Sequence, residues 1–255
     1  RSGSVTVSAV LTVGSTSVTD ELTFSVVWLA SLELQLFYKD GVTPFTSDEL
    51  RHRYACTTPA PEFHSLTVRA YGYLTSGMEG FVGSGAAFAA SGGQLSGSGS
   101  SRVLTVLSAG SVTLSVSAQP DPDDISNSTT LTAIAEADSY TFEWDLGLSQ
   151  GSTVNAGYAS SSSTTARLQY ASGYVETIAD GDRPSLLTFT SSDTATLVIS
   201  NTGAFQPQQN SPNLLPLDVS ASLCDGQTVG PHGVFVNLRH AAPVDYDIGS
   251  TYEAV

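Results

Sequence analysis

Carboxylates are the side chains of this sequence that could most readily bind a metal ion. They gather at three turn-like places: Asp121, Asp123 and Asp124; Asp180 and Asp182; and Asp245 and Asp247. Calcium takes six to eight oxygen ligands, and carboxylates are prominent among them. None of the clusters follows the D-x-[DN]-x-[DN]-G spacing of a calcium loop. We therefore expect solvated turns and no metal site, with Asp121, Asp123 and Asp124 as the candidate ligands should calcium bind.

A second pair of carboxylates, Glu143 and Asp145, flanks Trp144 and could suggest a site that cleaves sugars. Glycosidases place two carboxylates opposite each other across the scissile bond. Residues i and i+2 of a strand instead point to the same side of the sheet. The spacing therefore predicts a solvent-facing pair beside a tryptophan of the core.

Histidines and glycine-rich segments add no further catalytic candidate. His52, His64, His232 and His240 are scattered, and neither they nor the cysteines have the spacing of a zinc site. His64, just before a strand, is predicted on a surface loop. The Gly-Ser-Gly segments at 83–85 and 97–99 lack the context of a nucleophile elbow or a phosphate loop. We expect no catalytic residue and no cofactor, and predict that the chain is not an enzyme.

The two cysteines, Cys56 and Cys224, are too far apart in sequence for a C-x-x-C motif. They could pair with each other, remain buried as free thiols, or bond to a neighbouring subunit. We favour the Cys56–Cys224 disulfide in an oxidising compartment, where it would clamp the two domains.

Glycans are a further class of modification that the sequence permits. Asn127-Ser128-Thr129 is an N-x-[ST] sequon, a glycan site in a secreted eukaryotic protein and a turn in a bacterial one. The segments at 57–61 and 160–165 have a mucin-like composition. The sequence predicts Asn127 as the candidate glycosylation site.

The composition favours an extracellular or cell-surface protein. Charged residues make up 13% of the chain, and the formal net charge is −15 with only 9 Lys and Arg. Such a chain has no basic stripe for a phosphate backbone, so nucleic acid is excluded as a partner. No run of 18 apolar residues occurs, so we expect no transmembrane segment. The polar start at Arg1 and the abrupt end at Val255 are typical of a mature or excised piece of a longer protein.

Strand signals recur along almost the whole chain and predict an all-β fold. Short runs of β-branched and aromatic residues alternate with Ser and Thr between Gly, Asp, Asn or Pro. We expect Ser4–Val13 to place Val5, Val7 and Val10 on one face, Leu22–Tyr38 to form two strands or one bent strand, and Val103–Leu107 to form a hairpin with Ser111–Ala118. One or two helical turns are expected at Ser47–Tyr54.

Two immunoglobulin-like β-sandwich domains in tandem account for this pattern. Gln119–Asp124 breaks the strands, so we place the boundary there, with domains 1–119 and 120–255. Leu114-Ser-Val-Ser-Ala118 recurs as Leu217-Asp-Val-Ser-Ala221, each after a strand that ends in Gly. The second domain has longer loops, and its end leads into a further domain or neighbouring subunit. Trp28 and Trp144 are the candidate core tryptophans, one for each domain.

These residues also carry a family resemblance. Phe88-Ala-Ala-Ser91 and Phe189-Thr-Ser-Ser192 are each followed by a strand that ends in Gly and by an L-x-V-S-A strand. This order resembles the C-terminal half of bacterial-Ig-like (BIG-type) domains. The stretch from Val234 to Gly249 resembles a joint between tandem ectodomains, as in the transmembrane-132 family and in mastigoneme-like proteins. The resemblance implies structural or adhesive work and transfers no catalytic residues.

We therefore predict a structural subunit or segment of an extracellular filament or surface coat. Copies would associate with one another through apolar patches and strand edges, and Ser4–Val13 could complete a neighbour's sheet. The alternative is an adhesin or receptor module that binds carbohydrate or protein through loops such as Tyr158–Thr165. A secreted enzyme acting on polysaccharide through Glu143 or Asp145 is the least favoured reading.

Overall fold

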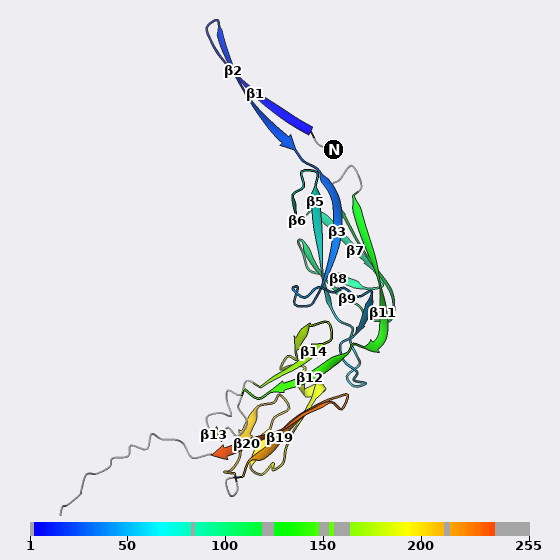
Figure 1. Cartoon of the computed structure of the whole chain (residues 1–255), viewed down its shortest axis with the longest axis vertical. Helices are drawn as coiled ribbons and strands as arrows, with labels where there is room; N and C mark the ends of the chain where they lie inside the picture. The colour runs from blue at the N-terminus through cyan, green and yellow to red at the C-terminus, as the bar shows by residue number, and fades with distance from the viewer. Residues whose placement is uncertain are drawn as a thin grey trace, which may run out of the picture. The chain divides into compact units, whose positions relative to one another are not determined.

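The computed structural model describes residues 3–82, 85–118, 125–147, 153–155, 164–211 and 215–237. Its elements are strands apart from one helical turn, α1 (Arg183–Leu186), so the prediction of an all-β chain is confirmed within the described ranges. The chain divides into two compact units (Figure 1). Unit 1 comprises Arg1–Tyr54 and Pro61–Asp138, and unit 2 comprises Ala55–Ala60 and Ser139–Val255.

Unit 1 contains a β-sandwich of two sheets. The first sheet has the order β3-β5-β9-β8 with β6 also paired to β5, formed by β3 (Leu29–Tyr38), β5 (Leu66–Leu74), β6 (Glu79–Phe81), β8 (Gln94–Ser96) and β9 (Ser101–Thr105). The second has the order β4-β11-β10-β7, formed by β4 (Glu49–His52), β7 (Ala86–Ser91), β10 (Gly110–Ala118) and β11 (Ser126–Ala137).

The core of unit 1 lies between these sheets. Leu32 and Ala70 come from the first sheet, and Ala86 and Val116 come from the second. Burial alternates along β10, where Val112, Leu114 and Val116 point inward, as a half-buried antiparallel strand requires. The alternation of apolar and polar residues in the sequence of β10 therefore matches the face that the strand buries.

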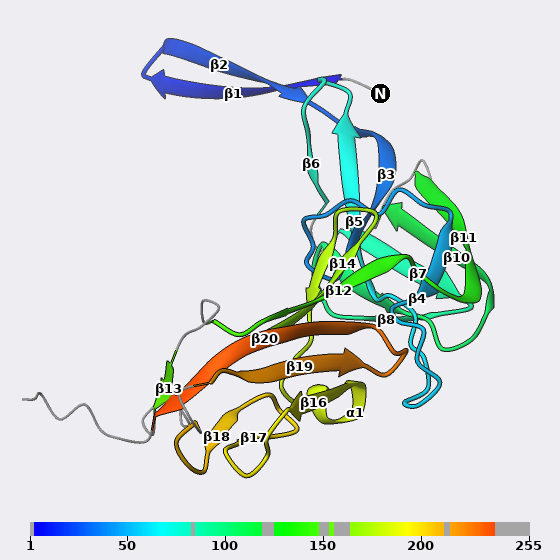
Figure 2. The ribbon, with the colours of Figure 1, turned by 60° about the horizontal axis from the view of Figure 1, so that its bottom comes forward.

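Unit 2 also contains two main β-sheets, one of three strands and one of four (Figure 2). One has the order β12-β14-β15, formed by β12 (Tyr140–Asp145), β14 (Thr165–Tyr170) and β15 (Val175–Thr177). The other has the order β13-β20-β19-β16, formed by β13 (Thr153–Asn155), β16 (Leu187–Ser191), β19 (Leu217–Leu223) and β20 (Thr228–Asn237). A small pair, β17 (Leu197–Ile199) and β18 (Phe205–Pro207), completes the described strands of this unit.

The four-stranded sheets of the two units share one topology. In each, an antiparallel hairpin, β10–β11 or β19–β20, is flanked by an antiparallel strand, β7 or β16. On the other side lies a strand parallel to the last strand of the hairpin, β4 or β13. The L-x-V-S-A segments fall on β10 and β19, so the predicted internal repeat corresponds to a repeated sheet.

A two-stranded ribbon, β1 (Gly3–Val13) and β2 (Thr16–Val26), precedes the sandwich of unit 1 (Figure 1). Among the described strands, β1 and β2 pair only with each other. Leu22–Tyr38 therefore contributes to two strands, β2 and β3, in agreement with one of the two predicted arrangements.

The chain divides into its two units at a different residue from the predicted boundary. They divide between Asp138 and Ser139, because β11 pairs with β10 along Ser117 to Gly110 and so belongs to unit 1. The break at Gln119–Asp124 falls inside that hairpin, and it lies outside the described residues.

Two local predictions were wrong. Val103–Leu107 and Ser111–Ala118 do not form a hairpin, because β9 joins β5 and β8 in one sheet while β10 joins β7 and β11 in the other. Ser47–Tyr54 is not helical. Its residues 49–52 form β4, in which Leu50 is fully buried and pairs with Ala133 of β11, so tertiary packing overrides the local helix signal.

Gly92, in the turn between β7 and β8, is a point where an added methyl group should destabilise unit 1. Its φ is +80°, and a Cβ would overlap the carbonyl oxygen of Ser111. Gly77 has φ +83° with no atom within 4 Å of its Cβ position, so it isolates the strain of the left-handed conformation. We expect Gly77→Ala to cost about 1–2 kcal/mol and Gly92→Ala about 1–3 kcal/mol more, measured by urea unfolding. Equal losses in the two variants would contradict the steric account.

Candidate functional site

The predicted calcium ligands Asp121, Asp123 and Asp124 lie outside the described residues, as do Asp245 and Asp247. Asp180, in the remaining acidic cluster, lies 3.0 Å from Nη1 of Arg183. Among the residues that the structure describes, no group of three or more His, Cys, Asp or Glu is placed to hold a metal ion. The acidic cluster at 180–182 therefore lies in a turn in which Asp180 is paired with Arg183.

Glu143 and Asp145 point to solvent on either side of buried Trp144, as the strand spacing predicts. Trp144 is 4% exposed and packs against the ring of Phe189 at 5.5 Å. Trp28 is 44% exposed, so its prediction as a core tryptophan was wrong. It lies between β2 and β3, where its amide and carbonyl both bond to Thr75.

The described histidines serve as packing groups. His64 is 2% exposed, with its Nε2 3.3 Å from Oδ2 of Asp138, so its prediction on a surface loop was wrong. The reason is a backbone bond from His64 to Arg51, which holds this segment against the sandwich. His52 packs on Phe63, and burial lowers the pKa of its imidazole. His232 lies 5.9 Å from Trp144, and His240 is outside the described residues.

Asn127, the predicted glycosylation site, lies on β11 and not in a linker. Its side chain is half-buried and its Nδ2 donates a hydrogen bond to the carbonyl oxygen of Leu32 at 2.9 Å. Leu32 belongs to the facing sheet, so this bond joins the two sheets of unit 1. A glycan would replace one of the two hydrogens on Nδ2, so that only the remaining N–H could donate to Leu32.

Cys56 and Cys224 are joined by a disulfide with a Cα–Cα distance of 5.4 Å. Both belong to unit 2, because the segment Ala55–Ala60 packs there although its neighbours in sequence belong to unit 1. Beside the disulfide, the Tyr140 hydroxyl accepts a bond from the Ala55 amide at 3.0 Å and donates one to Oδ2 of Asp225 at 2.6 Å. Burial, together with the bond to Asp225, raises the pKa of Tyr140. These contacts fasten the inserted segment to unit 2.

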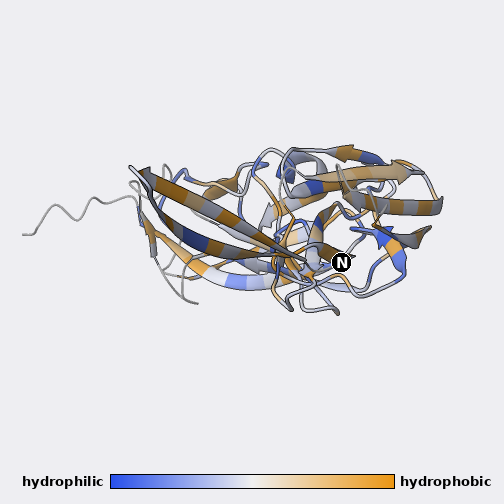
Figure 3. Cartoon of the chain, turned by 90° about the horizontal axis from the view of Figure 1, so that it is seen from above, coloured by the Kyte–Doolittle hydropathy of each residue, from blue (hydrophilic) through white to orange (hydrophobic). Residues whose placement is uncertain are grey.

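The ribbon β1–β2 has one exposed face that is mostly apolar, interrupted at its middle by Ala9 opposite Asp20. Register places Val5 opposite Phe24, Val7 opposite Leu22, and Leu11 opposite Val18. The large apolar residues of this face are 50–71% exposed: Val5, Val7, Leu11, Val13, Val18, Leu22 and Phe24. Apolar and polar bands alternate along the ribbon that begins at the N-terminus in Figure 3. We call these seven residues the ribbon face.

The opposite side of the ribbon is polar and carries cross-strand hydrogen bonds. Thr6 bonds to Thr23 at 3.0 Å, Ser8 to Glu21 at 3.1 Å, and Thr12 to Ser17 at 3.0 Å. The ribbon is thus amphipathic, with a defined apolar side. Large exposed apolar side chains gathered on one side of a ribbon are typical of an interaction site.

Alternation in the sequence revealed half of this surface. Ser4–Val13 was predicted as an exposed strand with Val5 and Val7 on one face, which the structure shows, but Val10 lies on the polar side opposite Thr19. The contribution of β2 was missed, because the predicted second segment began only at Leu22. The alternating Val18, Leu22 and Phe24 were the signal that could have extended it.

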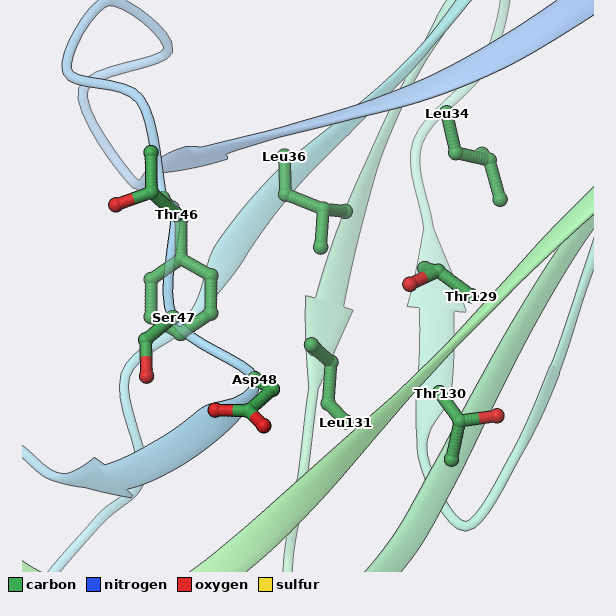
Figure 4. A pocket seen from close by; sticks show the side chains of 9 residues that line it. Leu34, Leu36, Thr46, Ser47, Asp48, Thr129, Thr130 and Leu131 are labelled. Carbon is green, nitrogen blue, oxygen red and sulfur yellow. The ribbon is translucent and has the colours of Figure 1, made fainter.

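A cavity of about 290 Å³ opens between β3 and β11 of unit 1 (Figure 4). Leu34 and Leu36 line it from β3, Leu131 from β11, and Asp48 supplies a carboxylate. Strand β4 pairs with β11 only from Thr132 onward, so the cavity adjoins the part of β11 that β4 does not cover. The other polar groups of the lining are the hydroxyls of Thr46, Ser47, Thr129 and Thr130, and neither histidine nor lysine is among the lining residues. The cavity lies at the edge of the sandwich, beside the part of β11 that β4 leaves uncovered.

The loop Tyr158–Thr165, predicted as a ligand-binding loop of an adhesin, lies mostly outside the described residues. Its end is described: Thr164 is buried and its hydroxyl bonds to the carbonyl of Gly203 at 3.2 Å. This part of the loop is therefore structural. In the described ranges, no helix has the length and apolar character needed to span a membrane.

No family model matches the sequence, and no curated protein matches it. Among solved structures, domains 6–7 of the surface layer protein SbsC are 11% identical, with 84% of this chain and 100% of that chain covered and a TM-score of 0.29. SbsC domains 1–6 are 19% identical, with 92% and 32% covered and a TM-score of 0.30. Chicken VE-cadherin EC1-2 is 12% identical, with 76% and 99% covered and a TM-score of 0.25. Similarity at this level transfers no function.

Proposed function

We propose that this chain is a non-catalytic, structural segment of an extracellular filament or surface coat, built from sandwich units in series. The observation that carries the proposal is the ribbon face, whose seven apolar side chains are too exposed for a surface that stays in contact with water. An isolated two-stranded ribbon is only marginally stable in water, so a partner surface would also stabilise its fold. The ribbon face is then a contact surface of the assembled protein.

The location is supported by the disulfide and the composition. Unit 2 contains the Cys56–Cys224 disulfide. Because disulfides persist in oxidising compartments, this bond favours an extracellular location. The low proportion of charged residues and the net charge of −15 suit a soluble surface protein that meets no nucleic acid. Contacts between copies of the chain through exposed strand edges, such as those of β1 and β2, belong to the same proposal.

The test compares two charged variants of strand β2. Leu22→Lys with Phe24→Lys places two charges on the ribbon face, and Thr23→Lys with Ser25→Lys places the same charges on the polar face. We expect the unmodified chain and the Thr23/Ser25 variant to associate as concentration rises, because association removes their apolar ribbon faces from water. The Leu22/Phe24 variant should remain monomeric, with at least a tenfold weaker association in sedimentation velocity.

The comparison has a clear contrary outcome. If all three proteins are equally monomeric or equally associated, the ribbon face is not a contact surface, and the proposal loses its main support. Amide exchange of units 1 and 2 serves as the control for folding, because neither pair of substitutions touches a buried residue.

A further inference from the structure

The ribbon repeats a hairpin that unit 1 already contains. Gly3-Ser-Val-Thr6 recurs as Gly110-Ser-Val-Thr113, and ranges 3–26 and 110–133 have equal length. Their registers also agree, since Gly3 pairs with Val26 and Gly110 with Ala133. The cross-strand hydroxyl contact between Thr6 and Thr23 at 3.0 Å has its counterpart between Thr113 and Thr130 at 3.3 Å. The ribbon β1–β2 therefore corresponds in register to the described part of the β10–β11 hairpin.

The apolar positions that correspond differ strongly in burial. Val5 is 50% exposed and its counterpart Val112 is 1% exposed. Phe24 is 51% exposed and its counterpart Leu131 is 2% exposed. In β10–β11 this face closes the core of unit 1 against the sheet that contains β3 and β5. The ribbon face thus has the residues of a sandwich core without the facing sheet.

The far end of the ribbon face follows the same correspondence. Leu11 and Val18, paired at the far end of the ribbon, match Ala118 and Ile125. Ala118 and Ile125 both pack at the border of the unit 1 core. The ribbon face therefore extends as far as the core-facing surface of β10–β11.

The connection that follows the hairpin is repeated as well. Two residues, Val27 and Trp28, join β2 to β3, and two residues, Asp138 and Ser139, join β11 to β12. The Trp28 carbonyl accepts a bond from the Thr75 amide at 2.9 Å, just after β5. The Ser139 carbonyl accepts one from the Ala171 amide at 3.1 Å, just after β14. Each hairpin thus leads into the first strand of the next sheet through two residues with the same backbone bond, although β11 runs four residues beyond Ala133, the counterpart of Val26.

A third copy of the hairpin, β19–β20, completes the comparison. Leu217 and Val219 correspond to Leu114 and Val116, and all four are buried. In both units the hairpin is flanked by an antiparallel strand and a parallel strand. In both units the facing sheet, β3-β5-β9-β8 or β12-β14-β15, also precedes the hairpin in sequence.

We propose that β1–β2 is the closing hairpin of a further sandwich of this type, whose facing sheet and two flanking strands are formed by residues that precede Arg1 in the polypeptide. The order of elements in units 1 and 2 assigns these strands to the N-terminal side. Each facing sheet among the described residues already carries its own hairpin, so a second copy could supply the ribbon with a facing sheet only by displacing β10–β11 or β19–β20. The inference rests on the proposed role of the ribbon face as a contact surface and names what covers it.

A hairpin exchange tests whether the ribbon can close a sandwich. In the full chain, residues 110–133 are replaced by a copy of residues 3–26, with Asn127 retained because it bonds to Leu32 of the facing sheet. The matched control inserts residues 4–27 instead, which shifts the alternation by one residue and turns the apolar side chains outward. The readout is amide exchange of β3 and β5, which are in the facing sheet.

We expect the in-register exchange to keep protection of β3 and β5 within about tenfold of the parent chain, and the shifted control to lose at least a hundredfold. Equal loss in both would overturn the correspondence. The result is independent of the sedimentation test, since a failed exchange leaves the ribbon face free to contact some other partner.

A second measurement tests where the partner sheet comes from. In a polypeptide extended toward its N-terminus by roughly 100 residues, the size of one such sandwich, amides of residues 3–26 should become at least a hundredfold more protected than in the 255-residue chain. Unchanged exchange would overturn the assignment to preceding residues. So would protection of 3–26 in dimers of the 255-residue chain with simultaneous exposure of 110–133, because a second copy would then supply the sheet.

Discussion

Replacing Arg183 with methionine should remove about 3–5 kcal/mol from the stability of unit 2. Arg183 is buried at the start of α1, and its guanidinium donates to three carbonyl oxygens, those of Thr164 at 2.8 Å, Thr202 at 2.9 Å and Ile178 at 3.4 Å. Methionine fills a similar volume but donates no hydrogen bond. Carbonyl groups that the arginine satisfied would then be buried without a donor.

The position of these carbonyls explains why one side chain has so large an effect. Thr164 precedes β14, Thr202 lies in the turn between β17 and β18, and Ile178 follows β15. Arg183 therefore links three connections that are distant in sequence. The ion pair with Asp180 adds little, because the Asp180 side chain is exposed.

The measurement is guanidinium unfolding followed by the fluorescence of Trp144, in a Trp28→Phe background so that only unit 2 is observed. Arg167→Met is the matched control, because Arg167 lies on the exposed side of β14. We expect the control to change stability by no more than about 0.5 kcal/mol. A loss below 1 kcal/mol for Arg183→Met would show that the three carbonyls find other donors.

Faces of strands were predictable from the sequence, but the sheets that the strands join were not. Alternation along β10, β12 and β19 indicates which residues point inward, and Val112, Trp144 and Val219 are buried accordingly. The same pattern contains no information on the partner strand. Neighbours β9 and β10 enter different sheets because each buries its apolar side against the opposite layer.

The candidate site shows the same limit. The apolar side of β1 could be anticipated in part from its alternation, which only Val10 breaks. Burial of His64 and the strand at β4 could not, because both depend on contacts with residues far away in sequence: Asp138 for His64 and Ala133 for Leu50. The short repeat Gly-Ser-Val-Thr became informative only when the registers of the two hairpins could be compared.

The Cys56–Cys224 disulfide joins the inserted segment Ala55–Ala60 to the rest of unit 2. Replacing Cys56 and Cys224 together with serine should lower the stability of unit 2 by about 2–4 kcal/mol. The disulfide closes a loop with a sequence separation of 168 residues, and cross-links over long loops restrict the unfolded chain most strongly. The variant also frees Ala55–Ala60, which the structure holds against unit 2 although strands of unit 1 precede and follow it.

Two comparisons separate the covalent link from the hydrogen bonds beside it. Unfolding of the parent chain should become easier by the same amount when reductant is present, whereas the double serine variant should not respond. Tyr140→Phe removes the bonds to Ala55 and Asp225 but keeps the disulfide, so it should lose only about 1–2 kcal/mol and remain sensitive to reductant. Intact-mass measurement with and without reduction confirms the pairing in the same samples. If reductant leaves the unfolding midpoint of the parent chain unchanged, the polar contacts of Tyr140 and the packing of the segment hold Ala55–Ala60 in place without the disulfide.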